Sequence, residues 1–504
     1  MCELKIITEN RILTIPAEKG RLVSSILQQH LPSFALPCAG NHTCGKCMVK
    51  VSGKLSSLSP AEEKLLSAAD IAKGIRLACA CRLEGDATIV LQEKTESKII
   101  AWYRIPAFSH TESGFGFAVD IGTTTVALQL IERSSGKILA ERLAENVQRS
   151  YGADVISRID SCKTAGLETL SDAIASQIEE MAAGCLQDCG LSAADISESV
   201  VTGNSTMLHL YEGLDPASLA VVPFDVVSYF GSYSRRTLAG APVYLPRCIG
   251  AYVGADIICA ILAADLHKGG IQLLADIGTN GEMALVKGGR LLCCSTAAGP
   301  AFEGAGISQG MPAAASAISK VSITDDIISY ETIQNAAPAG ICGSGILDAL
   351  AVMLETEEMD DSGYLEPADE DMEDWPVGDS KVYITQKDIR QIQLAKSAIC
   401  GGVLTLLDQE GISADDVSRF VVAGGFGNTM NHASAAKIGL FPADLQDKTD
   451  FIGNGALGGA AMLLMNKSLR SYTEEMAKSA EELSLSTCAE FMDYYIDCMA
   501  FDEF

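Results

Sequence analysis

A four-residue segment, Asp-Ile-Gly-Thr, occurs twice in the chain, at 120–123 and at 276–279, and the two copies are 156 residues apart. Each copy lies between two apolar runs, in FAVDIGTTTVALQL at 117–130 and in LLADIGTNGEMALV at 273–286. Two apolar runs joined by a tight turn predict a pair of strands connected by a hairpin. A repeat at this distance predicts two similar lobes, because the repeats of solenoid proteins are only ~20–50 residues long.

The turn of each hairpin has residue types that hold phosphate. Glycine lets the backbone turn tightly and present its N–H groups to phosphate oxygens, and the threonine hydroxyls add further donors. An aspartate at the end of a strand can hold Mg²⁺, usually through its water molecules. Two such hairpins facing each other would hold a triphosphate from both sides. We therefore expect an ATP and Mg²⁺ site formed by Asp120, Gly122, Thr123, Thr124, Asp276, Gly278, Thr279 and Asn280.

Other glycine-rich segments are expected at the same cleft. RFVVAGGFGN at 419–428 is predicted to be a strand that runs into Gly424, Gly425 and Gly427, where an adenosine could lie against the bare backbone. IGNGALGGAAML at 452–463 predicts the start of a helix that packs closely on a neighbouring lobe. VVTGNSTM at 200–207 is predicted to be a strand lining the cleft.

Four cysteines near the start of the chain follow the pattern C-x5-C-x2-C and, after a gap, R-L-A-C. Four thiolates at this spacing are the ligand set of a [2Fe-2S] cluster, so the expected ligands are Cys38, Cys44, Cys47 and Cys79. Cys81 stays an alternative to Cys79, because in a strand the two would point to the same side. A zinc site is a further alternative, although zinc sites more often have two C-x2-C pairs.

The formal net charge of −28 argues against binding to DNA, RNA or an anionic membrane surface, since each of these partners is itself negative. The start MCELKIITEN lacks the features of a signal peptide, and no stretch reaches the ~18 apolar residues of a membrane span. We therefore expect a cytoplasmic protein in which the 17 cysteines are reduced thiols or cluster ligands. At 504 residues, the chain should form more than one folding unit.

These motifs support two resemblances. Residues 1–92 resemble ferredoxins of the β-grasp fold, with a cysteine spacing more similar to the adrenodoxin-like branch than to the plant one. Residues 115–504 resemble the actin-like ATPase superfamily, which includes the sugar kinases and implies two ribonuclease-H-like lobes with ATP in the cleft. The expected fold is α/β plus α+β, with a 2Fe-2S ferredoxin domain at 1–92, a linker at 93–114 and a two-lobed ATPase domain at 115–504.

The second resemblance also suggests which residue activates the attacking water or hydroxyl group. Sugar kinases of this superfamily often place an aspartate for this task before the second hairpin, where this chain has Asp256. Glu282 is the rival candidate, and Asp276 completes the set of candidate catalytic residues. The alternative for Asp256 is a structural role as a helix cap.

Almost the whole chain resembles the reductive activators of corrinoid-dependent methyltransferases. The segments that carry this resemblance include ENVQRSYGADVISRI at 145–159, AGPAFEGAGI at 298–307 and AGICGSGILDAL at 339–350. The resemblance implies a protein that uses ATP to reduce inactive Co(II) to Co(I) in a partner, with an electron from its own 2Fe-2S cluster. The implied partners are a corrinoid protein of a methyltransferase system and an electron donor protein or reductant, and a homodimer is reasonable.

Other function classes fit the same two modules. A redox-regulated small-molecule kinase would transfer phosphate to an acceptor, which substrate-dependent release of ADP would reveal. An ATP-dependent activator of a radical dehydratase would hold a four-iron cluster between two subunits, which the iron content per chain and the EPR signal would distinguish. A regulatory ATP sensor would transfer no electron to any corrinoid protein.

Overall fold

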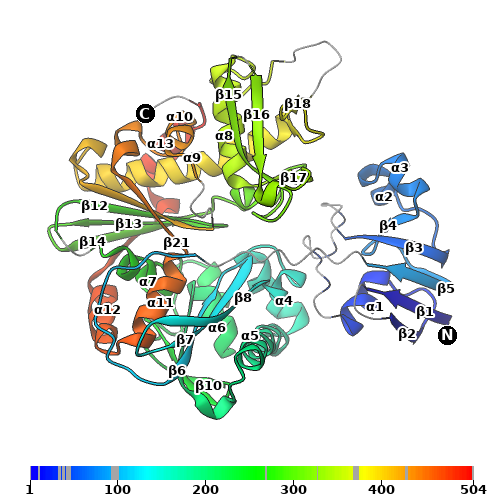
Figure 1. Ribbon diagram of the computed structural model, residues 1–504, viewed down its shortest axis with the longest axis horizontal. Helices are drawn as coiled ribbons and strands as arrows, with labels where there is room; N and C mark the ends of the chain where they lie inside the picture. The colour runs from blue at the N-terminus through cyan, green and yellow to red at the C-terminus, as the bar shows by residue number, and fades with distance from the viewer. Residues whose placement is uncertain are drawn as a thin grey trace.

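The computed structural model shows an N-terminal unit with one sheet and a larger C-terminal unit with two main sheets (Figure 1). The described residues are 2–8, 12–31, 34, 36, 40, 42, 47–91, 102–266, 269–325, 327–366, 374–425 and 430–501.

The N-terminal unit is a five-stranded mixed sheet covered by a helix. Its elements are β1 (Cys2–Ile7), β2 (Ile12–Ala17), α1 (Val23–His30), β3 (Met48–Leu55), α2 (Pro60–Leu65), α3 (Ala68–Ala72), β4 (Ile75–Leu77) and β5 (Leu83–Val90). The strand order is β2-β1-β5-β3-β4, with β1 parallel to β5 and antiparallel to β2. Side chains of β1 and β5 alternate between buried and exposed, and the buried ones share a core with those of α1. This architecture confirms the predicted ferredoxin-like fold.

The C-terminal unit has two lobes, each built on a six-stranded sheet. The first sheet consists of β6 (Phe115–Ile121), β7 (Thr125–Glu132), β8 (Lys137–Glu145), β9 (Ile196–Gly203), β10 (Ser232–Leu238) and β11 (Ala241–Leu245). The second consists of β12 (Gln272–Ile277), β13 (Gly281–Lys287), β14 (Arg290–Thr296), β20 (Arg419–Gly424), β21 (Thr449–Gly453) and β22 (Glu481–Leu483).

The two sheets share one topology. In each, three successive strands pair antiparallel, and the next strand returns parallel to the first of them, so that β9 lies beside β6 and β20 beside β12. The orders β8-β7-β6-β9-β11 and β14-β13-β12-β20-β21 therefore correspond strand by strand. This correspondence confirms the two similar lobes and the ribonuclease-H-like fold predicted from the repeat.

Helices cover both sheets, and two smaller sheets extend the second lobe. The helices are α4 (Val155–Ala165), α5 (Leu167–Cys189), α6 (Ser205–Glu212), α7 (Ala255–Ala264), α8 (Gly343–Glu355), α9 (Gln386–Gln409), α10 (His432–Lys437), α11 (Gly455–Met465), α12 (Ser468–Ser479) and α13 (Ala489–Asp497). The added strands are β15 (Ala317–Thr324), β16 (Ile327–Thr332), β17 (Gly340–Ile341), β18 (Asp374–Pro376) and β19 (Tyr383–Thr385). Among the helices of the described ranges, none combines the length and the apolar character of a membrane span.

The prediction of a strand over the whole of 200–207 was wrong. Strand β9 ends at Gly203, and helix α6 begins at Ser205. The Asn204 side chain accepts a hydrogen bond from the backbone N–H of Met207 at 2.9 Å, which is the geometry of a helix N-cap. The strand therefore ends before the capping asparagine, and the rest of the segment is helical.

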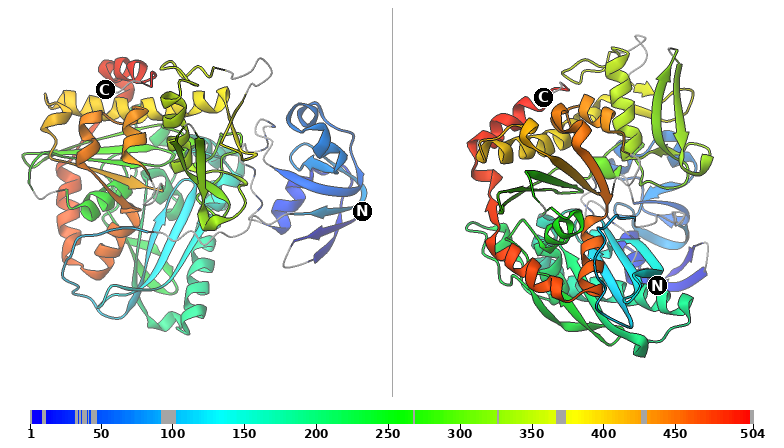
Figure 2. Two further views of the ribbon diagram at one scale, coloured as in Figure 1. Left: turned by 45° about the horizontal axis from the view of Figure 1, so that its top comes forward. Right: turned by 60° about the vertical axis from the view of Figure 1, so that its left-hand side comes forward.

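Helices α7 and α11 cross between the two sheets and join the lobes (Figures 1 and 2). Helix α7 contacts strands of both sheets, and α11 packs on β6 and β9. A Cβ atom at Gly459 of α11 would lie only 2.1 Å from the carbonyl oxygen of Cys259 in α7. The backbones approach this closely only because position 459 has no side chain.

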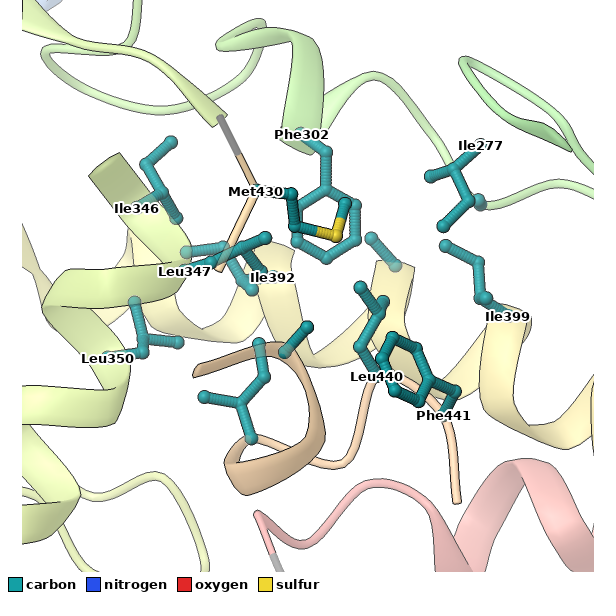
Figure 3. Packing of buried hydrophobic residues seen from close by; sticks show 14 of the residues in the cluster. Ile277, Phe302, Ile346, Leu347, Leu350, Ile392, Ile399, Met430, Leu440 and Phe441 are labelled. Atoms are coloured by element: carbon teal, nitrogen blue, oxygen red, sulfur yellow. The ribbon is translucent and has the colours of Figure 1, made fainter. Parts of the chain in front are cut away.

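The core of the second lobe reaches from its sheet to the loop that follows β14. Figure 3 shows Ile277 at the end of β12, Phe302 of the short helix η4 (Ala301–Glu303) and Ile399 of α9 in one cluster. The Phe302 side chain is only 4% exposed. The end of β12 and the short helix η4 therefore pack on the same hydrophobic core.

Residues 102–114, part of the segment predicted to be a linker, pack along the C-terminal unit. The Tyr103 hydroxyl donates a hydrogen bond to Gln129 of β7 at 2.8 Å. The backbone N–H of Arg104 donates to the carbonyl oxygen of Ile452 at 2.9 Å, and its guanidinium forms an ion pair with Asp450. These contacts tie the segment to both lobes.

We expect Gly459→Ala to lower the free energy of unfolding by about 1–3 kcal/mol, because the added methyl group would overlap the backbone of Cys259. The matched control is Gly184→Ala in α5, where the nearest atoms belong to the flexible end of Arg142, 3.5 Å away. The control should gain up to ~1 kcal/mol, since alanine suits a helix interior better than glycine. Denaturant unfolding measures both changes, and similar shifts for the two variants would contradict the close crossing.

Candidate functional site

The turn between β6 and β7 is closed by backbone and side-chain hydrogen bonds. Asp120 lies near the end of β6, and the N–H of Gly122 donates to the carbonyl oxygen of Thr125 at 2.9 Å. Asn146, after β8, donates through its side-chain amide to the Gly122 carbonyl at 2.8 Å and through its backbone N–H to the Thr124 carbonyl at 2.8 Å. The conformation of the turn is therefore fixed from two sides, within the turn and from Asn146.

Two further elements contact Thr123 in the same turn. The Asn204 amide donates to the Thr123 hydroxyl at 3.1 Å, and the buried Arg158 guanidinium donates to the Thr123 carbonyl. Burial and the neighbouring charge of Arg149 lower the pKa of Arg158 to about 9. Arg158 thus lies against the first turn, and Arg149 adds a second positive charge near it, which would attract an anion.

The turn between β12 and β13 repeats this arrangement in the second lobe. Asp276 lies near the end of β12, and the N–H of Gly278 donates to the Asn280 carbonyl at 3.0 Å. The N–H of Gly299 donates to the Thr279 carbonyl at 2.9 Å, which ties the loop after β14 to this turn. The two aspartates therefore occupy equivalent places in the two lobes.

The two turns meet across the cleft. The hydroxyl oxygens of Thr124 and Thr279 are 2.7 Å apart and share a hydrogen bond. The Thr279 hydroxyl also lies 3.2 and 3.3 Å from the two carboxylate oxygens of Glu303. Hydroxyl donors from both lobes thus converge on one position, which is the arrangement expected for holding a phosphate from both sides.

Four acidic side chains gather at the ends of the strands beside these turns. Burial and the charge of Asp256 raise the pKa of Asp276 to about 8, and they raise that of Asp120 to about 7 despite a hydrogen bond from Asn454. Burial also raises the pKa of Glu282 well above its ordinary value, and its bond with Asp256 adds to this rise. The proton of this pair therefore stays on Glu282, and the cluster as a whole favours a cation.

Asn454 links the helix α11 to this cluster. Its side-chain amide donates to Asp120 at 2.9 Å, while its side-chain oxygen accepts from the N–H of Leu457 at 2.7 Å and caps α11. Its backbone N–H donates to the carbonyl oxygen of Trp102 at 2.9 Å. One residue therefore joins the candidate nucleotide site, the helix crossing and the segment that follows the N-terminal unit.

The glycine segment after β20 lies beside the second turn. Gly424 has a φ of +112°, and a Cβ there would lie 2.2 Å from the Ile277 carbonyl oxygen and 3.1 Å from Oδ1 of Asp276. Among the described residues, no atom lies within 4 Å of the place of a Cβ at Gly425. These two glycines leave a bare backbone next to Asp276, and Gly427 lies outside the described residues.

The chemistry of the cleft fits Mg²⁺ bound together with nucleotide phosphates. Mg²⁺ keeps several water molecules and is usually held by one or two carboxylates plus phosphate oxygens. Asp120 and Asp276 offer one carboxylate from each lobe. Among the described residues, no three His, Cys, Asp or Glu side chains form a group that could hold a metal ion by themselves.

The N-terminal unit brings two of the four predicted cluster cysteines together. The sulfur atoms of Cys47 and Cys79 are 3.2 Å apart, both side chains are buried, and neither cysteine is in a disulfide. Cys81 is fully buried in the hydrophobic core of the unit. Cys38 and Cys44 lie outside the described residues. Two facing thiols that are not joined in a disulfide suit a shared iron–sulfur cluster.

Glu62 holds the strand that leads to Cys79. Its carboxylate, fully buried, accepts from Nε of Arg76 at 2.7 Å and from the N–H of Leu77 at 3.1 Å. The same carboxylate accepts from the N–H of Ser59, which completes a capping box at the start of α2. The cysteine therefore follows a strand end that is fixed by a charged hydrogen-bond network.

Several residues of the site were not predicted from the sequence. The side chains that hold or join the turns, from Asn146, Asn204, Asn454 and Glu303, come from four separate segments. Each asparagine precedes a helix or a 3₁₀ turn and is an N-cap, so the capping signal was present, but their contacts to the turns were not. Glu303 lies in AGPAFEGAGI, a segment whose glycines predict a turn without indicating what it contacts.

Family descriptions match three consecutive parts of the chain. Residues 7–84 match the 2Fe-2S iron-sulfur cluster binding domain. Residues 115–269 match the RACo middle region, and residues 270–503 match the C-terminal domain of RACo, the ASKHA domain. The three matches follow the order of the N-terminal unit, the first lobe and the second lobe.

Individual relatives agree with this division. The corrinoid activation enzyme RamQ of Eubacterium limosum is 33% identical over 424 residues, which cover 78% of this chain and 71% of the relative. A Co(II) methylated amine-specific corrinoid protein reductase of Methanosarcina barkeri is 25% identical over 422 residues, 76% of each chain. The solved structure of a reductive activator for corrinoid, iron-sulfur protein superposes with a TM-score of 0.71 at 28% identity, covering 99% of this chain and 98% of that one. The chain therefore belongs to the RACo family, in which a 2Fe-2S ferredoxin domain is joined to an ASKHA domain that has an actin-like and sugar-kinase-like fold.

Proposed function

We propose that this protein is an ATP-dependent reductive activator. It passes one electron from a 2Fe-2S cluster to the inactive Co(II) of a partner corrinoid protein and so produces Co(I). The observation that carries the proposal is the pairing of two sites in one chain, the facing thiols of Cys47 and Cys79 and the converging hydroxyls of Thr124 and Thr279. Relatives named for corrinoid activation and for Co(II) corrinoid protein reduction support it.

The energetics explain why such a transfer would use ATP. Ferredoxin clusters of the plant type have potentials near about −400 mV, and the cobalt couple is expected to lie lower. A gap of roughly 200 mV would oppose the transfer of one electron by about 4.6 kcal/mol. ATP can offset this only by favouring a partner-bound state in which the cobalt is easier to reduce.

Each site has a proposed set of residues. The cluster, which supplies the one-electron chemistry when it is bound, would be held by Cys38, Cys44, Cys47 and Cys79. Mg²⁺ and ATP would be held by Asp120, Gly122, Thr123, Thr124, Asp276, Gly278, Thr279, Asn280, Gly424, Gly425 and Gly427. The bare backbone at Gly424 and Gly425 supports an adenosine position beside the second turn.

The partners belong to the same proposal. The corrinoid protein would bring the cobalamin, and a separate protein or small reductant would reload the cluster. The charge of −28 disfavours nucleic acid and favours partners that do not carry a dense negative charge. We further propose a cytoplasmic location and a homodimeric state.

The central experiment is anaerobic. The reduced protein is mixed with a Co(II) corrinoid protein, with and without Mg-ATP, and the visible spectrum is followed for Co(I). We expect Co(I) only when ATP is present. If ATP is hydrolysed while several corrinoid proteins stay as Co(II), the kinase and ATP-sensor functions become better supported than the activator.

The fourth cluster ligand can be tested with two neighbouring cysteines. We expect Cys79→Ala to lose the bound iron and the EPR signal of the reduced cluster, because its sulfur faces that of Cys47 at 3.2 Å. Cys81→Ala is the matched control and should keep both, since the sulfur atom that faces Cys47 belongs to Cys79. Iron content per chain and EPR spectra measure the outcome. The opposite pattern would make Cys81 the ligand.

The acidic cluster predicts how stability changes with pH. The pKa values of Asp120 and Asp276 in the folded protein, about 7 and about 8, lie above the ordinary value of about 3.9 for an unfolded chain. Their contribution to stability is therefore complete below pH ~4 and is lost as the pH rises through 7 and 8. Mg-ATP should counter this loss, so the increase in Tm that it causes should grow between pH 6 and pH 8.

Thermal unfolding at pH 6, 7 and 8 with and without Mg-ATP measures this effect. Asp276→Asn is the control, because it removes the carboxyl group with the higher pKa and should flatten the pH dependence of the nucleotide-free protein. A Tm increase by Mg-ATP that is constant or shrinks toward pH 8 would show that the cation does not bind at this cluster.

A further inference from the structure

Glu303 is the acidic residue that reaches the point where the two turns meet. Its carboxylate accepts from the Thr279 hydroxyl at 3.2 and 3.3 Å, and that hydroxyl is 2.7 Å from the Thr124 hydroxyl of the other lobe. The side chain is partly buried. A phosphate held by the two hydroxyls would therefore have this carboxylate as a direct neighbour.

The backbone around Glu303 is fixed from several sides. Phe302 is anchored in the core with Ile277 and Ile399 (Figure 3). The N–H of Glu303 donates to the Pro300 carbonyl at 3.0 Å, and the loop is bonded to the second turn through Gly299. Gly304, with a φ of +77°, lies so close to Met311 that a Cβ would be 2.6 Å from its backbone nitrogen. The carboxylate is thus held by a rigid loop rather than by a mobile one.

The charge around Glu303 suits a role beside a phosphate. Burial raises its pKa, while hydrogen bonds from Thr124 and Thr279 and the positive charge of Arg149 oppose that rise. Arg149 comes from the first lobe, and its Nε atom is buried with no hydrogen-bond partner among the residues that the structure describes. Its other contact is an ion pair with Glu145 at 3.3 Å. A cation with a free donor therefore lies near the carboxylate and could offset phosphate charge.

The other acidic residues are engaged elsewhere. Asp256 accepts from the N–H of Ile257 at 2.9 Å and is hydrogen-bonded to Glu282, which keeps the proton of the pair. Asp120 accepts from Asn454 at 2.9 Å. Asp276 lies against the backbone of Gly424. Among these groups, only Glu303 bonds to the hydroxyls of the turns.

We propose that Glu303, rather than Asp256, is the general base for ATP hydrolysis at this site, an inference that rests on the proposed ATPase function. A water molecule in the cleft attacks the γ-phosphorus, and the bond from this phosphorus to the β,γ-bridging oxygen breaks. ADP leaves with the electrons of that bond. The proton of the attacking water passes to the Glu303 carboxylate and from there to the released phosphate or to solvent.

The test separates turnover from binding. In Glu303→Gln, we expect the kcat for ATP hydrolysis to fall by about 10²–10⁴-fold, the usual range for removal of a general base. The Kd for Mg-ATP should stay within about threefold, because the glutamine can still accept from the Thr279 hydroxyl. Glu303→Asp keeps the carboxylate but shortens its reach, and should show an intermediate loss of kcat with the same Kd.

The matched control is Glu410→Gln. Glu410 is also a largely buried glutamate of the second lobe, but it pairs with Lys287 and Arg290 at the opposite end of β13 from the turn. Its variant should keep kcat. Unfolding curves show whether each variant is folded. If Glu303→Gln does not fold, the kcat and Kd of Glu303→Asp decide the test instead.

Each outcome decides one point. If the wild-type protein binds Mg-ATP but does not hydrolyse it, the proposed ATPase function fails. If the wild type hydrolyses ATP and Glu303→Gln keeps kcat within about threefold, the assignment of Glu303 is wrong. The assignment is equally overturned if kcat falls only in Asp256→Asn, or if Glu303→Gln loses affinity by the same factor as turnover, which would make Glu303 a binding residue.

Discussion

The close crossing of α7 and α11 determines where the two lobes meet, because these helices join the sheets that carry the two turns. Gly459 admits the backbone of α7 at Cys259, and Asn454 at the start of α11 reaches Asp120. At the start of α7, Asp256 lies among the acidic side chains of the cleft. The helices that set the distance between the lobes thus also carry groups of the candidate nucleotide site. A change in their crossing would change the distance between the two threonine hydroxyls.

The approach of the two lobes depends on the charge state of the acidic cluster between them. Carboxylates from both lobes are brought together, and burial and mutual repulsion raise the pKa values of Asp120 and Asp276 into the neutral range. Such groups must either take up protons or share a cation. Mg²⁺ bound with a nucleotide would satisfy carboxylates of both lobes at once, and it would therefore favour the state in which the turns are close. The repulsion between these carboxylates therefore favours binding of a cation between the two lobes.

Much of the architecture could be predicted from the sequence, because local patterns encode it. The repeated Asp-Ile-Gly-Thr turns lie between strands as predicted, and the two sheets share one strand order. The strand expected over 200–207 was wrong because one capping residue, Asn204, outweighed the apolar pattern. The contacts made by Asn454 and Glu303 could not be predicted, because they join residues far apart in the chain and depend on how the lobes pack. Local sequence patterns predicted the caps and turns but not the distant residues that they contact.

Asn454 also connects the acidic cluster to the segment that follows the ferredoxin domain. Asn454 bonds to Asp120 through its side chain and to the carbonyl oxygen of Trp102 through its backbone. Gly453, next to it, has a φ of +69°, and a Cβ there would lie 2.2 Å from the Trp102 carbonyl oxygen. The segment that follows the ferredoxin domain therefore rests directly on the loop that contacts the acidic cluster. If a cation drew Asp120 away from Asn454, the asparagine could shift, and its hydrogen bond to the backbone of Trp102 would shift with it. The candidate nucleotide site and the segment that follows the ferredoxin domain are thus connected through one capping residue.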